Sequence, residues 1–146
     1  MAKPELERLR ALLPGPDVDL AALLRDDERF AAAAAALADL IDPEVESIGV
    51  WRGGAVYAGI SGFREMWLDW LQPWGRYYSE IEEMIEDGDR VAILVRDRGL
   101  RDELEQEVEL RSGSVWSFRE GKVTRVEFYG SREELFEATG LPRKRG

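Results

Sequence analysis

Two acidic residues in segments of alternating apolar and polar residues are the candidates for chemistry in this chain. Asp97 ends a strand expected over 91–98, and the other residues on its face of that strand are apolar. Glu127 lies beside Phe128 in a strand expected over 122–129. A carboxyl group that faces an apolar cavity has its charged form disfavoured, so its pKa rises toward a value that suits acid–base catalysis. We therefore treat Asp97 and Glu127 as a candidate acid–base pair in one pocket.

A second interpretation of the same two residues stays open. Asp97 could end its strand at the solvent, and Glu127 could pair across the sheet with Arg96 or Arg111. The alternation in the last strand does not decide which of its faces is the inner one. The pattern therefore does not decide whether the two acids face a cavity or lie on a solvated face.

Five aromatic residues are candidate ligand contacts. The helix expected from Ser61 carries large apolar residues three and four positions apart, which places them on one face. Such a stripe either lines a cavity or fills the core. The candidate pocket walls are Tyr57, Trp67, Trp70 and Trp116, and Tyr129 is a candidate hydrogen-bond donor to the ligand.

The composition excludes several classes of function. The 146 residues carry a net charge of −10, which argues against a nucleic acid or an anionic membrane surface as partner. The chain has no Cys and no His, so disulfides, thiolate catalysis and the commonest zinc ligands are excluded. The acidic segment 80–86 lacks the ligand spacing of a cation site and is expected to be a solvated face. We expect no metal and no cofactor.

The order of the expected elements predicts one domain of the α+β class. With 45% hydrophobic residues, the chain is long enough to bury a core. Helices are expected over 28–40, from Ser61 to Pro73 and after the capping box at Ser131, and strands over 45–51, 56–57, 77–85, 91–98, 107–118 and 122–129. This order favours helices packed on one face of a curved antiparallel sheet, an arrangement that commonly leaves a pocket between them.

The two ends of the chain are expected to lie outside this domain. Residues 1–25 are rich in Pro, Gly and charge and are expected to form an arm with a short helix, capped by Asp17 or Asp19. Residues 142–146 are expected to be a tail. No signal-peptide core is visible, and the longest apolar run, 30–38, is too short to cross a bilayer, so a cytoplasmic location is expected.

Four motifs in sequence order resemble the SnoaL-like domain of the nuclear transport factor 2-like superfamily. They are Tyr57–Trp67 (YAGISGFREMW), Gly88–Gly99 (GDRVAILVRDRG), Val115–Tyr129 (VWSFREGKVTRVEFY) and the helix over 131–141, and the resemblance covers residues 26–141. It implies a cone-shaped α+β roll of the cystatin-like type, in which a curved antiparallel sheet wraps around N-terminal helices. It also implies a deep apolar pocket for a small apolar molecule, and a homodimer.

Enzymes of this superfamily differ in their chemistry. Limonene epoxide hydrolases hold an Arg-x-Asp pair and a second Asp. Asp97 and Glu127 match the two acids, whereas Val95 stands where the Arg would be. Polyketide cyclases and scytalone dehydratase depend on His, which this chain lacks. Asp97 resembles the protonated acid of the ketosteroid isomerases.

The resemblance therefore predicts a pocket protein for a small, largely apolar ligand. One alternative is a cofactor-independent isomerase, cyclase or epoxide hydrolase that works by acid–base catalysis. The other is a non-catalytic ligand-binding or dimerisation module.

Overall fold

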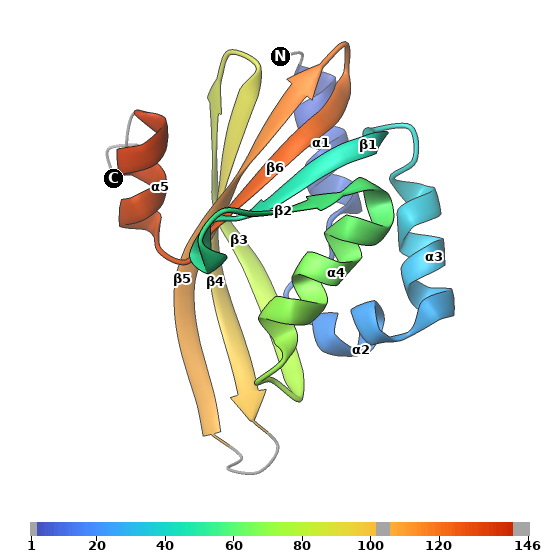
Figure 1. Cartoon of the computed structure of the whole chain (residues 1–146), viewed down its shortest axis with the longest axis vertical. Helices are drawn as coiled ribbons and strands as arrows, with labels where there is room; N and C mark the ends of the chain where they lie inside the picture. The colour runs from blue at the N-terminus through green and yellow to red at the C-terminus, as the bar shows by residue number, and fades with distance from the viewer. Residues whose placement is uncertain (1–2, 102–105, 142–146) are drawn as a thin grey trace.

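The computed structural model describes residues 3–101 and 106–141, which form helices layered on a single sheet (Figure 1). The helices are α1 (Lys3–Leu12), α2 (Leu20–Arg25), α3 (Asp27–Ala36), α4 (Gly59–Leu71) and α5 (Arg132–Thr139), with a short 3-10 helix η1 (Val50–Arg52). The strands are β1 (Ile41–Gly49), β2 (Ala55–Ala58), β3 (Arg76–Asp87), β4 (Arg90–Arg101), β5 (Gln106–Arg119) and β6 (Lys122–Tyr129).

These strands form one sheet in the order β2-β1-β6-β5-β4-β3. The antiparallel meander from β3 to β6 confirms the order predicted from the sequence. β1 lies parallel to β6 and antiparallel to β2, which extends the sheet beyond the meander. The parallel pair joins segments far apart in the chain, and no local pattern signals such a pairing. β3 lies at the opposite edge of the sheet from β2.

Two layers of helices enclose the sheet. α2, α3 and α4 lie together on one side of it and α5 lies on the other (Figure 1). One core contains Val91, Ile93 and Trp116, and a second core contains Ala92 and Leu135 of α5. β4 is buried on both faces from position 91 to position 94 because it carries apolar residues on both. The result is the predicted α+β roll, with a cavity-forming side under the N-terminal helices.

Local sequence signals set most element boundaries. The Asp19 carboxylate caps α2 by accepting the N–H groups of Ala21 and Ala22, and Ser131 caps α5 by accepting the Glu134 N–H. Both caps were predicted. Gly140 ends α5 in the left-handed conformation, at a φ of 68°, which glycine adopts without strain.

Two boundaries near Pro43 differ from the prediction. The helix expected over 28–40 ends at Ala36, where residues 37–40 turn into β1. Pro43 lies inside β1 rather than ending a helix, because the pairing of β1 with β6 shifts its register between Ile41 and Glu46. Such an irregularity tolerates a residue without an N–H. Trp51, expected to end this strand, belongs to η1.

The first 25 residues contribute to the core. Leu9 of α1 and Ala21 of α2 are fully buried, and Leu9 packs in the same cluster as Val91. In the described part of the chain, no helix is long and apolar enough to cross a membrane.

Gly99 provides a test of the packing at the β3–β4 end of the sheet. A Cβ atom at this position would lie 2.5 Å from a ring carbon of Trp74, so Gly99→Ala forces the indole or the strand to move. We expect a loss of about 1–3 kcal/mol in the free energy of unfolding, measured by urea denaturation. Gly15→Ala is the matched control, because nothing lies within 4 Å of its added Cβ. An equal effect of both substitutions would contradict this packing.

Candidate functional site

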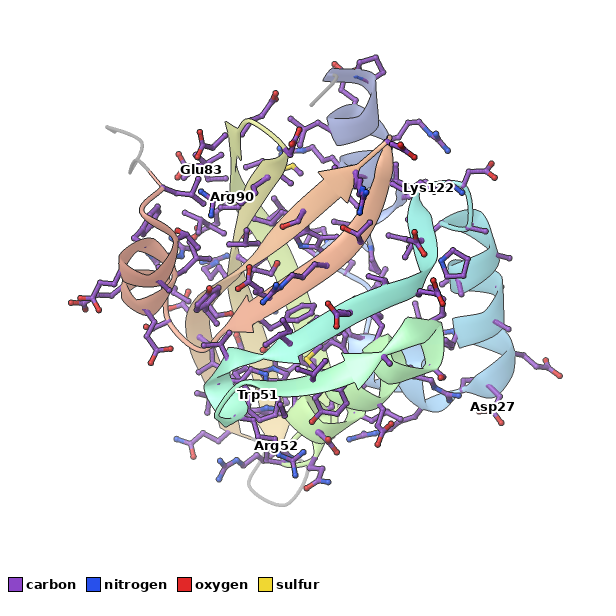
Figure 2. The ribbon with its side chains drawn as sticks, turned by 45° about the horizontal axis from the view of Figure 1, so that its top comes forward. Asp27, Trp51, Arg52, Glu83, Arg90 and Lys122 are labelled. Carbon is purple, nitrogen blue, oxygen red and sulfur yellow. The ribbon has the colours of Figure 1, made fainter. Side chains whose placement is uncertain are left out.

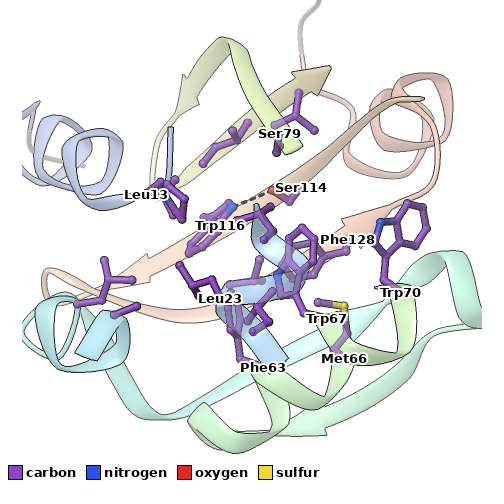
Figure 3. A pocket seen from close by; sticks show the side chains of 18 of the residues that line it. Leu13, Leu23, Phe63, Met66, Trp67, Trp70, Ser79, Ser114, Trp116 and Phe128 are labelled. Atoms are coloured by element: carbon purple, nitrogen blue, oxygen red, sulfur yellow. Dashed lines mark hydrogen bonds between the residues drawn. The ribbon is translucent and has the colours of Figure 1, made fainter. Parts of the chain in front are cut away.

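A cavity of about 190 Å³ lies between the inner face of the sheet and the N-terminal helices (Figure 3). Its walls come from α2, α3, α4, from the strands β1 and β3 to β6, from η1 and from the end of α1. Nearly all lining side chains are apolar or aromatic, and the polar exceptions are Ser79, Asp97, Ser112, Ser114 and Tyr129. The space is therefore suited to a molecule that is mostly apolar and carries few polar groups.

Strand alternation directs the polar residues into the cavity. On β4, Ile93, Val95 and Asp97 line it, while Arg96 and Arg98 lie on the other face. On β5, Ser112 and Ser114 line it in the same way. The face of β4 that carries Asp97 is therefore an inner face of the sheet.

α4 forms the aromatic wall opposite the sheet. Phe63, Met66, Trp67 and Trp70 project from one face of this helix into the cavity (Figure 3). The ring of Trp67 meets that of Phe128 edge to face at 5.6 Å between centroids. These contacts fix the rings that a ligand would touch.

Asp97 is the acidic residue of the described cavity wall, and it is only 2% exposed. Its Oδ1 accepts a hydrogen bond from the Ser79 hydroxyl and its Oδ2 one from the Tyr77 hydroxyl, both at 2.6 Å. Burial raises the pKa of the Asp97 carboxyl to about 6, although these hydrogen bonds and the charge of Arg132 act in the opposite direction. A carboxyl with this pKa exchanges its proton near neutral pH.

Tyr77 lies behind Asp97 and is fully buried. Its hydroxyl accepts a hydrogen bond of 2.8 Å from the indole N–H of Trp70. Burial and the neighbouring Asp97 raise the pKa of Tyr77 far above its usual range. The phenol therefore stays protonated and acts only as a hydrogen-bond donor to the carboxylate.

Ser114 offers a second polar group on the cavity wall. Its hydroxyl oxygen accepts the indole N–H of Trp116 at 2.8 Å (Figure 3). An indole is a donor only, so the hydroxyl proton of Ser114 remains available for an oxygen of a ligand. Ser114 pairs with Ile93, so this hydroxyl donor lies four residues along β4 from the buried carboxyl group of Asp97.

Four of the five predicted aromatic contacts line the cavity, namely Trp67, Trp70, Trp116 and Tyr129. Tyr57 lies outside the cavity wall. Its hydroxyl donates to the Asp69 carboxylate at 2.7 Å and accepts from Arg52 at 3.0 Å. Arg52 lies beside Trp51 at the turn between β1 and β2 (Figure 2). Tyr57 therefore belongs to a polar cluster that ties this turn to α4.

Glu127 is not brought together with Asp97. Val126 and Phe128 line the cavity, so the side chain between them lies on the other face of β6. The Glu127 carboxylate is half-buried and accepts a hydrogen bond from the Tyr129 hydroxyl at 3.3 Å. Burial, with the charge of Glu127 and this hydrogen bond, raises the pKa of Tyr129 to about 12. Glu127 therefore reaches the cavity wall only through Tyr129.

Ser79 and Trp51 are residues of the cavity wall that sequence analysis missed. Ser79 lies in the acidic stretch of β3, where its neighbours point away from the cavity. Only the β3–β4 register, which places Ser79 opposite Asp97, reveals the contact. The acidic segment itself forms ion pairs, with Glu80 bound to Arg96 and Glu82 bound to Arg132. The described residues include no cluster of acidic, His or Cys side chains arranged to hold a metal.

The family model of the SnoaL-like domain matches residues 28–126. The chain belongs to the SnoaL-like family. A search of curated proteins found no match.

Solved structures share the fold of this SnoaL-like chain at low identity. A putative SnoaL-like polyketide cyclase from Jannaschia sp. CCS1 is 16% identical, with a TM-score of 0.64 over 95% of this chain and 93% of that one. TerC, co-crystallised with polyporic acid, is 21% identical, with a TM-score of 0.63 over 92% and 97%.

A protein from Catenulispora acidiphila with a ketosteroid isomerase-like fold, in complex with trimethylamine, is 17% identical, with a TM-score of 0.56 over 88% of this chain and 96% of that one. These likenesses confirm the predicted cone-shaped roll. At these identities they establish the fold and leave the activity to be argued from the site.

The raised pKa of Asp97 predicts a dependence of stability on pH. Below the unfolded pKa, ordinarily 3.8, the group is protonated in both states and costs nothing. As pH rises toward about 6, the unfolded state releases the proton while the folded state keeps it, so stability falls. Between pH 4 and pH 7, we expect the free energy of unfolding of Asp97→Asn to rise by up to about 3 kcal/mol relative to that of the parent protein. Urea unfolding at both pH values measures this difference, and an unchanged difference would contradict the assignment.

Proposed function

We propose that this SnoaL-like protein binds a small, largely apolar molecule in the cavity and transfers a proton on it with Asp97 as the general base and acid. The observation that supports this proposal is a carboxyl group, 2% exposed, on an otherwise apolar and aromatic wall with a pKa of about 6. A base whose pKa lies near the working pH combines a useful charged fraction with useful basicity. No cofactor is needed for a reaction of this type.

The reaction can be written with Asp97 alone as the proton carrier. The ionised carboxylate removes a proton from a carbon or hydroxyl group of the ligand, and the electron pair moves onto a ligand oxygen. The Ser112 hydroxyl lines the cavity opposite Val95, two residues along β4 from Asp97, and is the group we assign to that oxygen. Asp97 then returns the proton at a second ligand atom and is regenerated. The product is an isomer or a cyclised form of the ligand.

A panel of apolar ketones and 1,3-diketones in D₂O tests the proposal with simple carbon acids in place of the natural ligand. We expect protein-dependent exchange of a C–H proton for deuterium, detected by mass spectrometry, that Asp97→Asn lowers by about a hundredfold or more. The rate should rise with pH around pH 6, where Asp97 loses its proton. Asp69→Asn is the matched control, because Asp69 also accepts a tyrosine hydroxyl but lies outside the cavity wall. Equal loss in both variants would contradict a specific role for Asp97.

Glu127→Gln tests the acid–base pair that the sequence predicted. If Glu127 acts only by orienting Tyr129, the substitution should lower exchange by less than about tenfold, since an amide oxygen still accepts the hydroxyl. A loss as large as that of Asp97→Asn would instead restore the paired mechanism.

A non-catalytic ligand-binding module is the second candidate. Only one acid lines the described cavity wall, and Val95 occupies the position of the arginine of the epoxide hydrolases, which favours binding without hydrolysis. This candidate predicts ligand uptake with no proton exchange in the deuterium assay. The homodimer and the cytoplasmic location implied earlier remain predictions, and sedimentation of the purified protein tests the first of them.

α3 provides a test of ligand uptake that both candidates share. Ala33 and Ala34 line the cavity, and no residue of α3 is fully buried, so space remains beneath the helix. We expect Ala34→Trp to fill this space and to weaken uptake of an uncharged apolar dye such as N-phenyl-1-naphthylamine at least tenfold in a fluorescence titration. Ala35→Trp on the exposed face is the control. Equal affinities of the two variants would place the dye outside this cavity.

A further inference from the structure

A chain of hydrogen bonds runs from α4 through β3 to Asp97 on β4. The indole N–H of Trp70 donates to the Tyr77 hydroxyl at 2.8 Å, and this hydroxyl donates to Asp97 Oδ2 at 2.6 Å. Trp70 is partly buried, and Tyr77 and Asp97 are buried. These hydrogen bonds therefore connect the aromatic wall of the cavity to Asp97 through groups that are shielded from bulk solvent.

The chemistry of the indole fixes the direction of this chain. An indole N–H can only donate, so the Tyr77 oxygen must be the acceptor in its bond with Trp70. The proton of the Tyr77 hydroxyl is then left to donate to Asp97. If the phenol turned to accept a proton from a protonated Asp97, either the Trp70 indole N–H or the phenol's own hydroxyl proton would be left buried without a partner.

The second oxygen of Asp97 has a different partner. Oδ1 accepts the Ser79 hydroxyl at 2.6 Å. A serine hydroxyl rotates freely between donating and accepting. Ser79 is partly exposed and lines the cavity, whereas Tyr77 is fully buried and is not part of the cavity wall. The two oxygens of one carboxyl group thus have unequal surroundings.

We propose that Trp70 is a positioning residue that acts on Asp97 through Tyr77, so that Oδ2 stays bound to the Tyr77 hydroxyl and Oδ1 exchanges the proton with the ligand. When the ligand gives its proton to Oδ1, Ser79 turns from donor to acceptor and no other proton moves. When Oδ1 returns the proton to the ligand, Ser79 turns back and Asp97 is again a carboxylate. The inference on Oδ1 rests on the proposed function, whereas the coupling of Trp70 to Asp97 does not.

Two charged groups lie near the hydrogen bonds that connect Trp70, Tyr77 and Asp97. The Asp19 carboxylate accepts the backbone N–H of Tyr77 at 3.1 Å and so fixes the position of Tyr77 on β3. The Arg132 guanidinium, bound to the carbonyl oxygen of Val95 at 2.9 Å on the neighbouring β4 segment, stabilises the charged form of Asp97. Neither group bonds to the carboxyl oxygens of Asp97 in the described structure, so the Tyr77 and Ser79 hydroxyls control them.

A double-mutant cycle tests the coupling without any substrate. The Asp97 carboxyl is titrated by ¹³C NMR in the unsubstituted protein and in Trp70→Phe, Tyr77→Phe and the double variant. Trp70→Phe should raise the titration midpoint of Asp97 by roughly 0.3–0.5 of a pH unit, because the Tyr77 hydroxyl becomes a weaker donor and is freed to accept. In the Tyr77→Phe background the same substitution should shift nothing further. Equal shifts in the two backgrounds would overturn the proposal.

Trp67→Phe is the matched control for the loss of an indole. Trp67 lies on the same helix and packs its ring on Tyr77 at 6.3 Å, but the described hydrogen bond to the Tyr77 hydroxyl comes from Trp70. We expect Trp67→Phe to move the Asp97 midpoint by the same small amount with or without the Tyr77 hydroxyl. A coupling with Tyr77 as large as that of Trp70 would show that packing, and not the N–H, carries the effect.

The unsubstituted protein gives a readout that does not depend on the folding of a variant. The ¹⁵N-labelled indole resonance of Trp70 should shift with pH at the midpoint of Asp97, and Asp97→Asn should remove this shift. A Trp70 resonance that ignores the titration of Asp97 would overturn the coupling. Because these experiments use no ligand, they can fail while deuterium exchange succeeds, or succeed while it fails, so the two proposals are judged separately.

Discussion

The burial of one carboxyl group in an apolar cavity is the constraint on which the rest of the site depends. Removing a carboxylate from water costs several kcal/mol unless hydrogen bonds replace the lost solvent. In this protein the Tyr77 and Ser79 hydroxyls supply those bonds, one to each oxygen of Asp97. They offset only part of the cost, so the pKa of Asp97 stays raised. A group in this state can exchange a proton near neutral pH.

Both hydrogen-bond partners of Asp97 lie on one strand of the sheet. Tyr77 and Ser79 are two residues apart on β3, so both side chains point to the same face as Asp97 on β4. β3 is an edge strand, and Asp19 fixes it from outside by capping α2 and accepting the Tyr77 N–H. Asp19, the cap of the short helix α2, thus also positions Tyr77, which donates a hydrogen bond to Asp97.

The other side chains of the cavity wall provide an apolar environment for Asp97 and are not proposed to react. Rings from α4, β5 and β6 pack against one another and keep the wall apolar, as the contacts of Phe63 with Trp116 and Phe128 show. α3 contributes a face of small side chains that is only partly covered. This arrangement accounts for a low local dielectric around Asp97 and leaves room for an apolar ligand.

The sequence predicted what local alternation determines and missed what pairing between strands determines. Alternation placed Asp97 on one face of β4 with Ile93 and Val95, and the structure shows that this face lines the cavity. Alternation could not place Glu127, because the β5–β6 register shifts at Thr124, which leaves Val123 and Val126 in the same core. The partner Ser79 carries no signal of its own, since its role follows from its position opposite Asp97.

The titration of Asp97 in the unsubstituted protein tests the central claim most directly. Its side-chain carboxyl carbon can be followed by ¹³C NMR from pH 3 to pH 9 and assigned by comparison with Asp97→Asn. We expect a midpoint near 6, because burial raises the pKa of the carboxyl group and the hydrogen bonds from Ser79 and Tyr77 lower it. A midpoint near 4, typical of a solvated aspartate, would contradict it.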